Sequence, residues 1–322
     1  MIPLLFTGGT ISMRHDRTLG GAVPALSGAE ILAATRGIGE VAEVEVEEWG
    51  RHPGPHMTTE LIWSLRNRIE EHLARAEVDG VVVTHGTDTL EESAYLTARS
   101  VQSEKPVIFT GAMRTASDLG WDGPANLLDA VRVAASAESR GYGVLVVMSG
   151  RVYAGIDVTK AHTHMLDAFE SPGLGPVGVI DDGAVIFRRA LPDQPAVLCP
   201  ERLGAPVDIV FAWAGADERL LDASRLVARG LVLAGLGRGN IPPAMVPGVG
   251  RWVADGKPIV ITSRAGRGRV GRTYGYPGGA RRLGELGALL GGSRRPQQAR
   301  IDLMLALGAG LGAAKLRELF EG

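Results

Sequence analysis

Threonine hydroxyls stand beside glycines in two short segments of this 322-residue sequence. Residues 7–11 read Thr-Gly-Gly-Thr-Ile, and residues 84–89 read Thr-His-Gly-Thr-Asp-Thr. Each segment follows a short apolar run, so each is expected just after a buried strand. Glycines let the backbone turn sharply there, which leaves amide hydrogens directed outward. Such amides favour a substrate carboxylate or an oxyanion that develops during acyl transfer.

A threonine hydroxyl is a poor nucleophile unless a base takes its proton or its pKa is lowered. Thr10 lies beside the two glycines of the first segment, and Thr87 is expected at the amino end of a helix. Lys160 is the candidate base, because a desolvated lysine can lose its proton. These three residues predict a site for nucleophilic attack on a carbonyl compound.

Structural explanations compete with this interpretation at several positions. A Gly-Gly-Thr segment after a strand often forms only a tight turn. Thr89 and Glu92 have the spacing of a capping box, and His85 is more often a hydrogen-bonded turn residue than a catalyst. His162 and His164 lack carboxylate or cysteine neighbours, so we expect no metal site, and no motif requires a cofactor.

The elements that must position these residues alternate between strand and helix. Apolar runs predict strands at residues 3–6, 41–49, 81–83, 106–110 and 143–148. Helices are predicted to begin at the Ser27 and Glu30 capping box, near Leu61, at Thr89 and at Asp122. This order predicts a largely parallel sheet with right-handed crossovers. Residues 177–180 and 184–187 are expected to form a β-hairpin that closes the first domain.

The alternation of predicted strands and helices stops after residue 188 and resumes at residue 207. Residues 189–206 are proline-rich and lack periodicity, which predicts a linker between domains 1–188 and 207–322. Strands at 207–213, 231–236 and 258–263, with helices near 296–307 and 313–320, predict a second, smaller parallel sheet. The predicted fold class is therefore α/β, with two α/β domains of which the amino-terminal one is larger.

The composition limits what the protein does. The chain is 45% hydrophobic and 22% charged, with 5% aromatic residues and a formal net charge of −2. This balance is typical of a soluble globular protein and gives no reason to expect nucleic acid as a partner. Cys199 is the only cysteine, so no intramolecular disulfide forms. No apolar stretch has membrane-spanning length and the apolar start is too short for a secretory signal, so we expect a cytoplasmic location.

The two threonine segments together resemble the two signatures of the bacterial-type asparaginases. Further segments of the same family pattern follow in order along nearly the whole chain. They are residues 109–114 (Phe-Thr-Gly-Ala-Met-Arg), 122–124 (Asp-Gly-Pro), 157–160 (Asp-Val-Thr-Lys), 239–240 (Gly-Asn) and 297–300 (Gln-Gln-Ala-Arg). Each segment is a weak signal alone, whereas several in register identify the chain as a family member.

The resemblance implies hydrolysis of L-asparagine to L-aspartate and ammonia, with specific roles for the matching residues. Thr10 is expected to be the nucleophile that forms an acyl-enzyme, and Thr87, Asp88 and Lys160 to form a second threonine centre. Asp88 is also expected to bind the α-amino group of the substrate. The predicted substrate-binding residues are Gly9, Gly54, Pro55, His56, Gly86, Ala112 and Asn240. The family also builds each site at a subunit contact, which implies a dimer or dimer of dimers with Asn240 supplied by a neighbour.

Two positions depart from the family pattern. The family has a tyrosine in the loop after the first signature, but no tyrosine precedes Tyr95 here. Arg14, His15, Asp16 and Thr18 are the candidate replacements. The family also has Ser-Gln where Gly54 and Pro55 stand, so Arg51, His52 or His56 is needed to replace the lost substrate contacts. The reaction class is less affected by these changes than the choice of amide is.

Other features of the sequence are compatible with different functions. Residues 266–271 match Gly-x-Gly-x-x-Gly, but residues 273–279 interrupt the helix that a dinucleotide fingerprint requires. Nine arginines and one acid lie between Arg264 and Arg300, which indicates an anion or nucleic-acid patch or, as we prefer, a solvated face or subunit contact. A non-catalytic sensor on this fold would not need Thr10, Thr87, Asp88 and Lys160 together. Hydrolysis of another small amide, such as glutamine or D-asparagine, remains the alternative activity.

Overall fold

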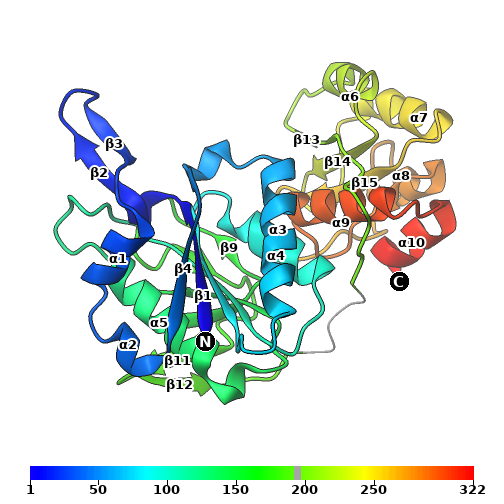
Figure 1. Ribbon diagram of the computed structural model, residues 1–322. Coiled ribbons are helices and arrows are strands. Elements are labelled where there is room, and N and C mark those ends of the chain that lie inside the picture. The colour runs from blue at the N-terminus through cyan, green and yellow to red at the C-terminus, as the bar shows by residue number, and fades with distance from the viewer. Residues whose placement is uncertain (192–196) are drawn as a thin grey trace. The chain divides into compact units, whose positions relative to one another are not determined.

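The chain forms two units, Met1–Val197 and Leu198–Gly322, each with its own sheet (Figure 1). The computed structural model describes residues 1–191 and 197–322. The predicted fold class is confirmed, because the larger sheet is mostly parallel and the smaller one is entirely parallel. Residues 192–196 of the predicted linker lie outside the described residues.

The sheet of the amino-terminal unit has eight strands in the order β12-β11-β8-β7-β6-β5-β1-β4. Five neighbouring strands are parallel: β4 (Val44–His52), β1 (Ile2–Gly8), β5 (Val81–Thr84), β6 (Val107–Thr110) and β7 (Val144–Met148). Three further strands continue the sheet with antiparallel pairing: β8 (Arg151–Ala154), β11 (Gly178–Asp181) and β12 (Ala184–Phe187). The predicted closing hairpin is therefore confirmed as β11 and β12.

The continuous apolar runs of the parallel strands reflect burial on both faces of the sheet. Every residue of β1 is buried, and so is every residue of β5, β6 and β7. Helices cover the two faces in two groups (Figure 1). One group is α1 (Gly28–Ala34), α2 (Ile38–Val41) and α5 (Gly123–Ala135), and the other is α3 (Thr59–Leu73) and α4 (Leu90–Ser100).

One crossover connection departs from the predicted handedness. The chain moves across the sheet in one direction from β5 to β6 to β7. It passes through α4 on one face in the first step and through α5 on the other face in the second. Two parallel crossovers that advance in the same direction over opposite faces have opposite hands. The prediction of uniformly right-handed crossovers is therefore wrong.

Several predicted element boundaries are confirmed and others are corrected. Ser27 and Glu30 form the predicted capping box at the start of α1. Helix α4 begins after Thr89, but the Thr89 side chain makes no capping hydrogen bond and is used elsewhere. Residues 41–43 do not belong to the predicted strand, because Val41 ends α2 and β4 begins at Val44.

A small hairpin after the first threonine segment was not predicted from the sequence. Strands β2 (Met13–Asp16) and β3 (Gly21–Pro24) pair with each other and project from the amino-terminal unit (Figure 1). The Asp16 carboxylate accepts hydrogen bonds from the backbone N–H groups of Thr18 and Leu19, and Gly20 has a φ of 67°. An Asx turn and a left-handed glycine therefore reverse the chain here.

The carboxyl-terminal unit has a four-stranded parallel sheet in the order β13-β14-β15-β16. Its strands are β13 (Val207–Phe211), β14 (Gly230–Gly235), β15 (Ile259–Ser263) and the short β16 (Leu289–Leu290). Its helices are α6 (Arg219–Arg225), α7 (Val246–Ala254), α8 (Ala280–Leu286), α9 (Pro296–Gly308) and α10 (Ala313–Glu321). One face packs around Trp252, a fully buried side chain whose indole N–H donates to the Leu221 carbonyl at 2.9 Å.

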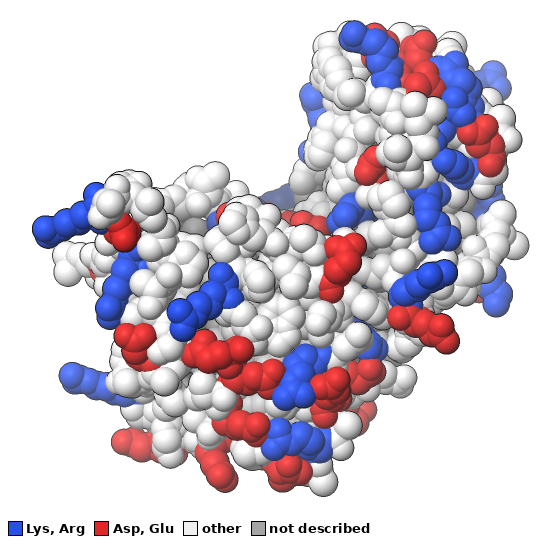
Figure 2. Space-filling view, turned by 45° about the horizontal axis from the view of Figure 1, so that its top comes forward, with Lys and Arg blue, Asp and Glu red and all other residues white. Residues whose placement is uncertain are grey.

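Basic and acidic side chains are interspersed on the face of the molecule that Figure 2 presents. Within the described residues, no helix combines the length and apolar character that crossing a membrane requires.

Candidate active site

Three glycines bring the two threonine segments into direct backbone contact. A Cβ atom added to Gly9 would lie 2.5 Å from the Cα of Gly86, and one added to Gly86 would lie 2.5 Å from the Cα of Gly54. Gly9 also has a φ of 79°, which side chains disfavour. The segments that follow β1, β4 and β5 therefore meet at one edge of the sheet, beyond the carboxyl ends of its parallel strands.

The first threonine segment is a short 3-10 turn, Thr10–Ser12, that begins at Gly9. The Gly9 N–H donates to the His52 carbonyl at 3.0 Å, and the Gly9 carbonyl accepts from the hydroxyl of Ser12 at 2.9 Å. Thr10 itself is half-buried. Its hydroxyl makes no hydrogen bond to any residue in the described part of the chain, so it is available to a substrate.

The second threonine segment meets Lys160 in a compact polar cluster. The Lys160 ammonium donates to the Thr87 hydroxyl at 2.9 Å and forms an ion pair with the Asp88 carboxylate at 2.6 Å. Thr87 is buried and Lys160 is 15% exposed, whereas the Asp88 side chain is 56% exposed. Thr87 and Lys160 therefore lie where water access is limited, with the open side of the cluster at Asp88.

Contacts made by the backbone of Lys160 hold this residue in place. It lies in β9 (Thr159–Lys160), which pairs with β10 (Phe169–Glu170). Its backbone N–H donates to the Glu91 carboxylate at 2.8 Å, and Glu91 lies in the first turn of α4. Glu91 was not predicted as a site residue from the sequence, although it lies only four residues after Thr87.

The segment at Gly54 is fastened to the second threonine segment by Thr89. The Thr89 hydroxyl donates to the Gly54 carbonyl at 2.8 Å, which explains why it does not cap α4. A Cβ atom on Gly54 would lie 3.2 Å from the Asp88 Cβ, so position 54 faces Asp88 closely. Pro55 and His56 follow in a 3-10 turn and are both exposed.

The imidazole ring of His85 stabilises the turn at Gly86 through hydrogen bonds. It is fully buried, its Nδ1 lies 2.9 Å from the Gly86 carbonyl, and its Nε2 lies 2.9 Å from the Ser93 hydroxyl. Since a carbonyl only accepts, Nδ1 carries the proton and Nε2 accepts from Ser93. Burial lowers the pKa of His85 from 6.5 to about 4, and the neighbouring His52 contributes in the same direction. His85 is thus a neutral structural residue.

Ala112 lies in the turn after β6, and this turn is held by the start of α5. The Asp122 carboxylate accepts hydrogen bonds from the backbone N–H groups of Met113 and Arg114, and the Asn126 side chain donates to the Gly111 carbonyl at 3.0 Å. Ala112 itself is fully buried. Residues 122–126, interpreted from the sequence as a helix start, therefore also fix the turn that carries Ala112.

Arg14 and Arg51, two candidates for replacing the missing family contacts, both influence the Glu30 carboxyl of α1. The pKa of the Glu30 carboxyl is lowered chiefly by hydrogen bonds from Ser27, with smaller contributions from Arg14 and Arg51. Both guanidinium groups are therefore close enough to act on Glu30 of α1. The backbone of His15 donates to the Ser117 hydroxyl at 3.0 Å.

Asn240 belongs to the carboxyl-terminal unit, where it ends the loop after β14. Its backbone bridges to Leu236, and its side-chain oxygen accepts from the Ala280 N–H at 3.3 Å. Across residues 1–191 and 197–322, no group of three or more histidine, cysteine or acidic side chains is placed to hold a metal ion.

Models of known families match both units of the chain. The model described as Asparaginase, N-terminal matches residues 1–193, and the Glutaminase/Asparaginase C-terminal domain matches residues 206–320. The chain belongs to the asparaginase family.

Individual asparaginases are similar to this chain over nearly its whole length. A probable L-asparaginase of Deinococcus radiodurans is 36% identical, covering 99% of this chain and 96% of that protein. An L-asparaginase of Bacillus licheniformis is 34% identical, covering 95% of each. The crystal structure of a probable cytoplasmic L-asparaginase from Campylobacter jejuni aligns with a TM-score of 0.88 at 30% identity, covering 99% of this chain and 98% of that one.

The glycine contact predicts a sharp difference between two glycine-to-alanine changes. Gly86→Ala would place a methyl group against Gly54, so the turns must separate, and we expect a loss of about 2 kcal/mol or more of unfolding free energy. Gly250→Ala is the matched control, because it lies in α7 with no atom within 4 Å of an added Cβ. Helix propensity should make that change neutral or stabilising by up to about 1 kcal/mol. Urea titration measures both, and equal stability of the two variants would contradict the close contact.

The neutral state of His85 predicts a pH dependence of stability. As the pH falls below about 6.5 the unfolded chain takes up a proton at His85, whereas the folded chain does so only near pH 4. The unfolded state therefore binds more protons in this window, and the folded state should lose about 3 kcal/mol between pH 6.5 and pH 4. His85→Asn keeps a donor near the Gly86 carbonyl and cannot titrate. Denaturation of both proteins across this range should show a flatter curve for the variant, and parallel curves would refute the assignment.

Proposed function

We propose that this asparaginase-family protein hydrolyses L-asparagine to L-aspartate and ammonia. The observation that carries the proposal is the position of Lys160, whose ammonium contacts both the Thr87 hydroxyl and the Asp88 carboxylate. The backbone contact of Gly9 with Gly86 brings the turn that carries Thr10 against this cluster. The names of the similar proteins from Deinococcus radiodurans and Bacillus licheniformis support the same activity.

Thr10 is the nucleophile in the proposed reaction. Its oxygen attacks the side-chain carbonyl carbon of asparagine, and the proton of its hydroxyl is passed to the amide nitrogen, which leaves as ammonia. The resulting ester between Thr10 and the aspartyl group is then hydrolysed by water, which restores the hydroxyl. Backbone N–H groups of the glycine-lined turns stabilise the negative charge on the carbonyl oxygen.

Thr87, Lys160 and Asp88 act together as the second centre. Thr87 positions the hydrolytic water or relays a proton, and Lys160 holds the Thr87 hydroxyl through the 2.9 Å hydrogen bond. One side of the Asp88 carboxylate forms the ion pair with the Lys160 ammonium, and the other side is exposed to solvent. That exposed edge binds the α-ammonium group of the substrate.

The α-carboxylate of the substrate, which is bonded to the same carbon as the ammonium group, is the part for which this site has fewest contacts, so another amide remains a candidate. Gly54 and Pro55 supply no side-chain hydrogen bond to an α-carboxylate, and Pro55 has no N–H group. The loss of one such charged contact weakens binding by about 1.5–3 kcal/mol. L-asparagine is therefore bound weakly, and glutamine, D-asparagine or a related small amide is the second candidate substrate.

We further propose a homo-oligomer, either a dimer or a dimer of dimers, in the cytoplasm. Asn240 is taken to complete the site of a neighbouring subunit, as the family resemblance implies, within a closed symmetric assembly. The similarity to a Campylobacter jejuni protein named as cytoplasmic supports the location, although a similar Haemophilus influenzae protein is named as periplasmic.

Removal of the threonine nucleophile tests the activity directly. Thr10→Ala should lower ammonia release from L-asparagine by at least about a thousandfold, because it removes the attacking oxygen. Thr87→Val and Lys160→Met should cause losses of similar size, and the combined variant should be little worse than either. Ser64→Ala on the exposed side of α3 is the control for loss of a hydroxyl. Near-normal turnover by Thr10→Ala would refute the role of Thr10.

Glu91 is a positioning residue whose effect passes through Lys160. Glu91→Leu removes the acceptor of the Lys160 N–H, so kcat should fall about ten- to a hundredfold with little change in KM. Glu91→Gln keeps an acceptor oxygen and should recover most of the rate. The pH profile of kcat should shift in the leucine variant only. An unchanged profile in all three proteins, at equal folded concentration, would mean that Glu91 only stabilises α4.

Subunit sharing is tested by mixing two inactive variants. In a hybrid of Thr10→Ala and Asn240→Ala subunits, one site receives Thr10 from one chain and Asn240 from the other, both intact. Co-expression should therefore restore asparaginase activity that neither variant shows alone. If Asn240 serves its own chain, every hybrid site lacks one residue and the mixture stays inactive.

A further inference from the structure

A cavity of about 590 Å³ lies within the carboxyl-terminal unit, apart from the residues assigned to catalysis. Its walls come from the loops that follow β14, β15 and β16, together with the end of α10. Ligands of α/β sheets bind beyond the carboxyl ends of parallel strands, which is where these loops lie. The volume is also typical of a site for a small molecule.

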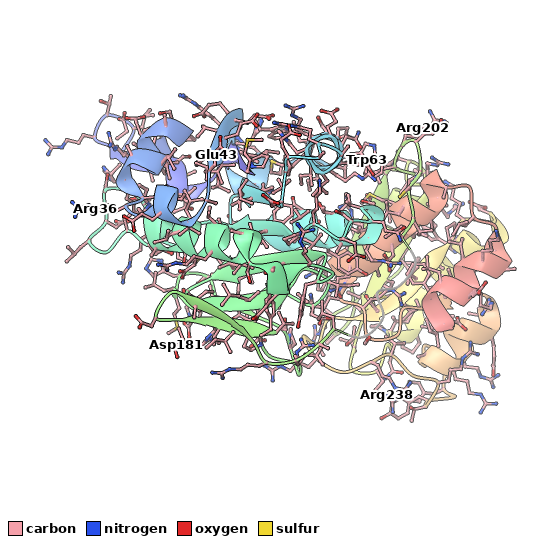
Figure 3. The ribbon with its side chains drawn as sticks, turned by 60° about the horizontal axis from the view of Figure 1, so that its bottom comes forward. Arg36, Glu43, Trp63, Asp181, Arg202 and Arg238 are labelled. Atoms are coloured by element: carbon pink, nitrogen blue, oxygen red, sulfur yellow. The ribbon has the colours of Figure 1, made fainter. Side chains whose placement is uncertain are left out.

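Arginine is the dominant charged residue of this cavity. Four guanidinium groups line it, and the only acidic side chain in the lining is Glu321. They belong to Arg238, Arg269, Arg272 and Arg294. Arg238 lies in a loop at the edge of the unit (Figure 3).

Two of the four guanidinium groups are already neutralised. Arg272 pairs with Glu321 at 2.7 Å, and Arg294 pairs with Asp302 at 2.7 Å. Arg238 and Arg269 form no ion pair with any residue in the described ranges, 1–191 and 197–322. The cavity therefore keeps an excess of positive charge.

Arg294 is anchored in the wall of the cavity, whereas Arg238, Arg269 and Arg272 are exposed side chains. The Arg294 guanidinium donates to the fully buried Asp302 carboxylate and to the Leu319 carbonyl at 2.7 Å, and it lies 5.1 Å above the centre of the Phe320 ring. The Arg238 guanidinium lies beside Gly271. The anchoring of Arg294 reduces the entropy cost of binding an anion on that side of the cavity.

The charge of the whole unit favours the same kind of ligand. Residues 198–322 contain 18 basic and 10 acidic side chains, for a formal net charge of +8. Residues 1–197 contain 16 basic and 26 acidic side chains, for −10. The overall charge of −2 thus conceals a strongly basic carboxyl-terminal unit.

We propose that this cavity binds a small anion with several phosphoryl groups, such as an oligophosphate or a nucleoside polyphosphate. The guanidinium fork matches phosphate oxygens in a bidentate geometry, which makes arginine the preferred residue for such groups. Several phosphoryl groups are needed to occupy a cavity of this size and to engage both unpaired arginines. The concave shape selects a small molecule over a nucleic-acid duplex, and the site does not depend on the proposed amidase activity.

Binding of sodium tripolyphosphate to the full-length chain tests the proposal by isothermal titration calorimetry. We expect one site per chain and weaker binding as sodium chloride is added, because the attraction is electrostatic. Arg238→Gln/Arg269→Gln should weaken binding at least tenfold, as expected for the loss of charged hydrogen bonds. Circular dichroism melting confirms that this variant is folded.

A second double variant separates a built site from general attraction. Arg281→Gln/Arg282→Gln removes the same charge from the exposed surface of α8, outside the cavity, and should leave the affinity within twofold of the unmodified chain. ATP in place of tripolyphosphate identifies the source of the ligand: tighter binding indicates a nucleotide, and equal binding an oligophosphate. Absence of tripolyphosphate binding, equal losses in both double variants, or binding of single-stranded RNA alone would overturn the proposal.

Discussion

The contact between the backbones of Gly9, Gly54 and Gly86 is the constraint on which the candidate site depends. The three segments that carry these glycines come from different crossovers, and they approach this closely only because Gly9 and Gly86 have no side chain at the point of contact. A single Cβ at Gly9 or Gly86 would fall within 2.5 Å of a neighbouring backbone atom. The same approach brings together the turns that carry Thr10 and Thr87, since each threonine follows one of these glycines directly.

Polar groups around this contact are arranged in a graded way from buried to exposed. His85 is fully buried and neutral, Thr87 is buried, Lys160 is mostly covered, and Asp88 reaches solvent. A charge costs least where water or a counter-ion is available, so the only ion pair of this series lies at its exposed end. The same order suits a reaction in which a charged substrate enters from the side of Asp88 and the neutral amide carbon reaches the threonine hydroxyls.

Buried strands and the threonine cluster were predictable from the sequence, whereas features set by single turns were not. Apolar runs identify β1, β5, β6 and β7 because both faces of the sheet are covered. Strand β8 was missed because only Ser149 and Gly150 separate it from β7, both with positive φ. Thr89 and Glu91 were misjudged for a related reason, since each bonds to a segment distant in sequence, at Gly54 and Lys160. Local spacing gives no information on such partners.

The glycines of the site differ in why a side chain is absent, and this difference bears on substrate choice. Gly9 and Gly86 are required by the fold, because a Cβ atom on either would strike backbone. Gly54 is different: its added Cβ would lie 3.2–3.4 Å from Asp88 and Gly86, which a shift of a few tenths of an ångström relieves, and its φ is not positive. A small side chain at position 54 therefore requires a smaller displacement of its neighbours than one at Gly9 or Gly86. Because position 54 faces Asp88, a glycine there leaves the space beside the Asp88 carboxylate unfilled by a side chain.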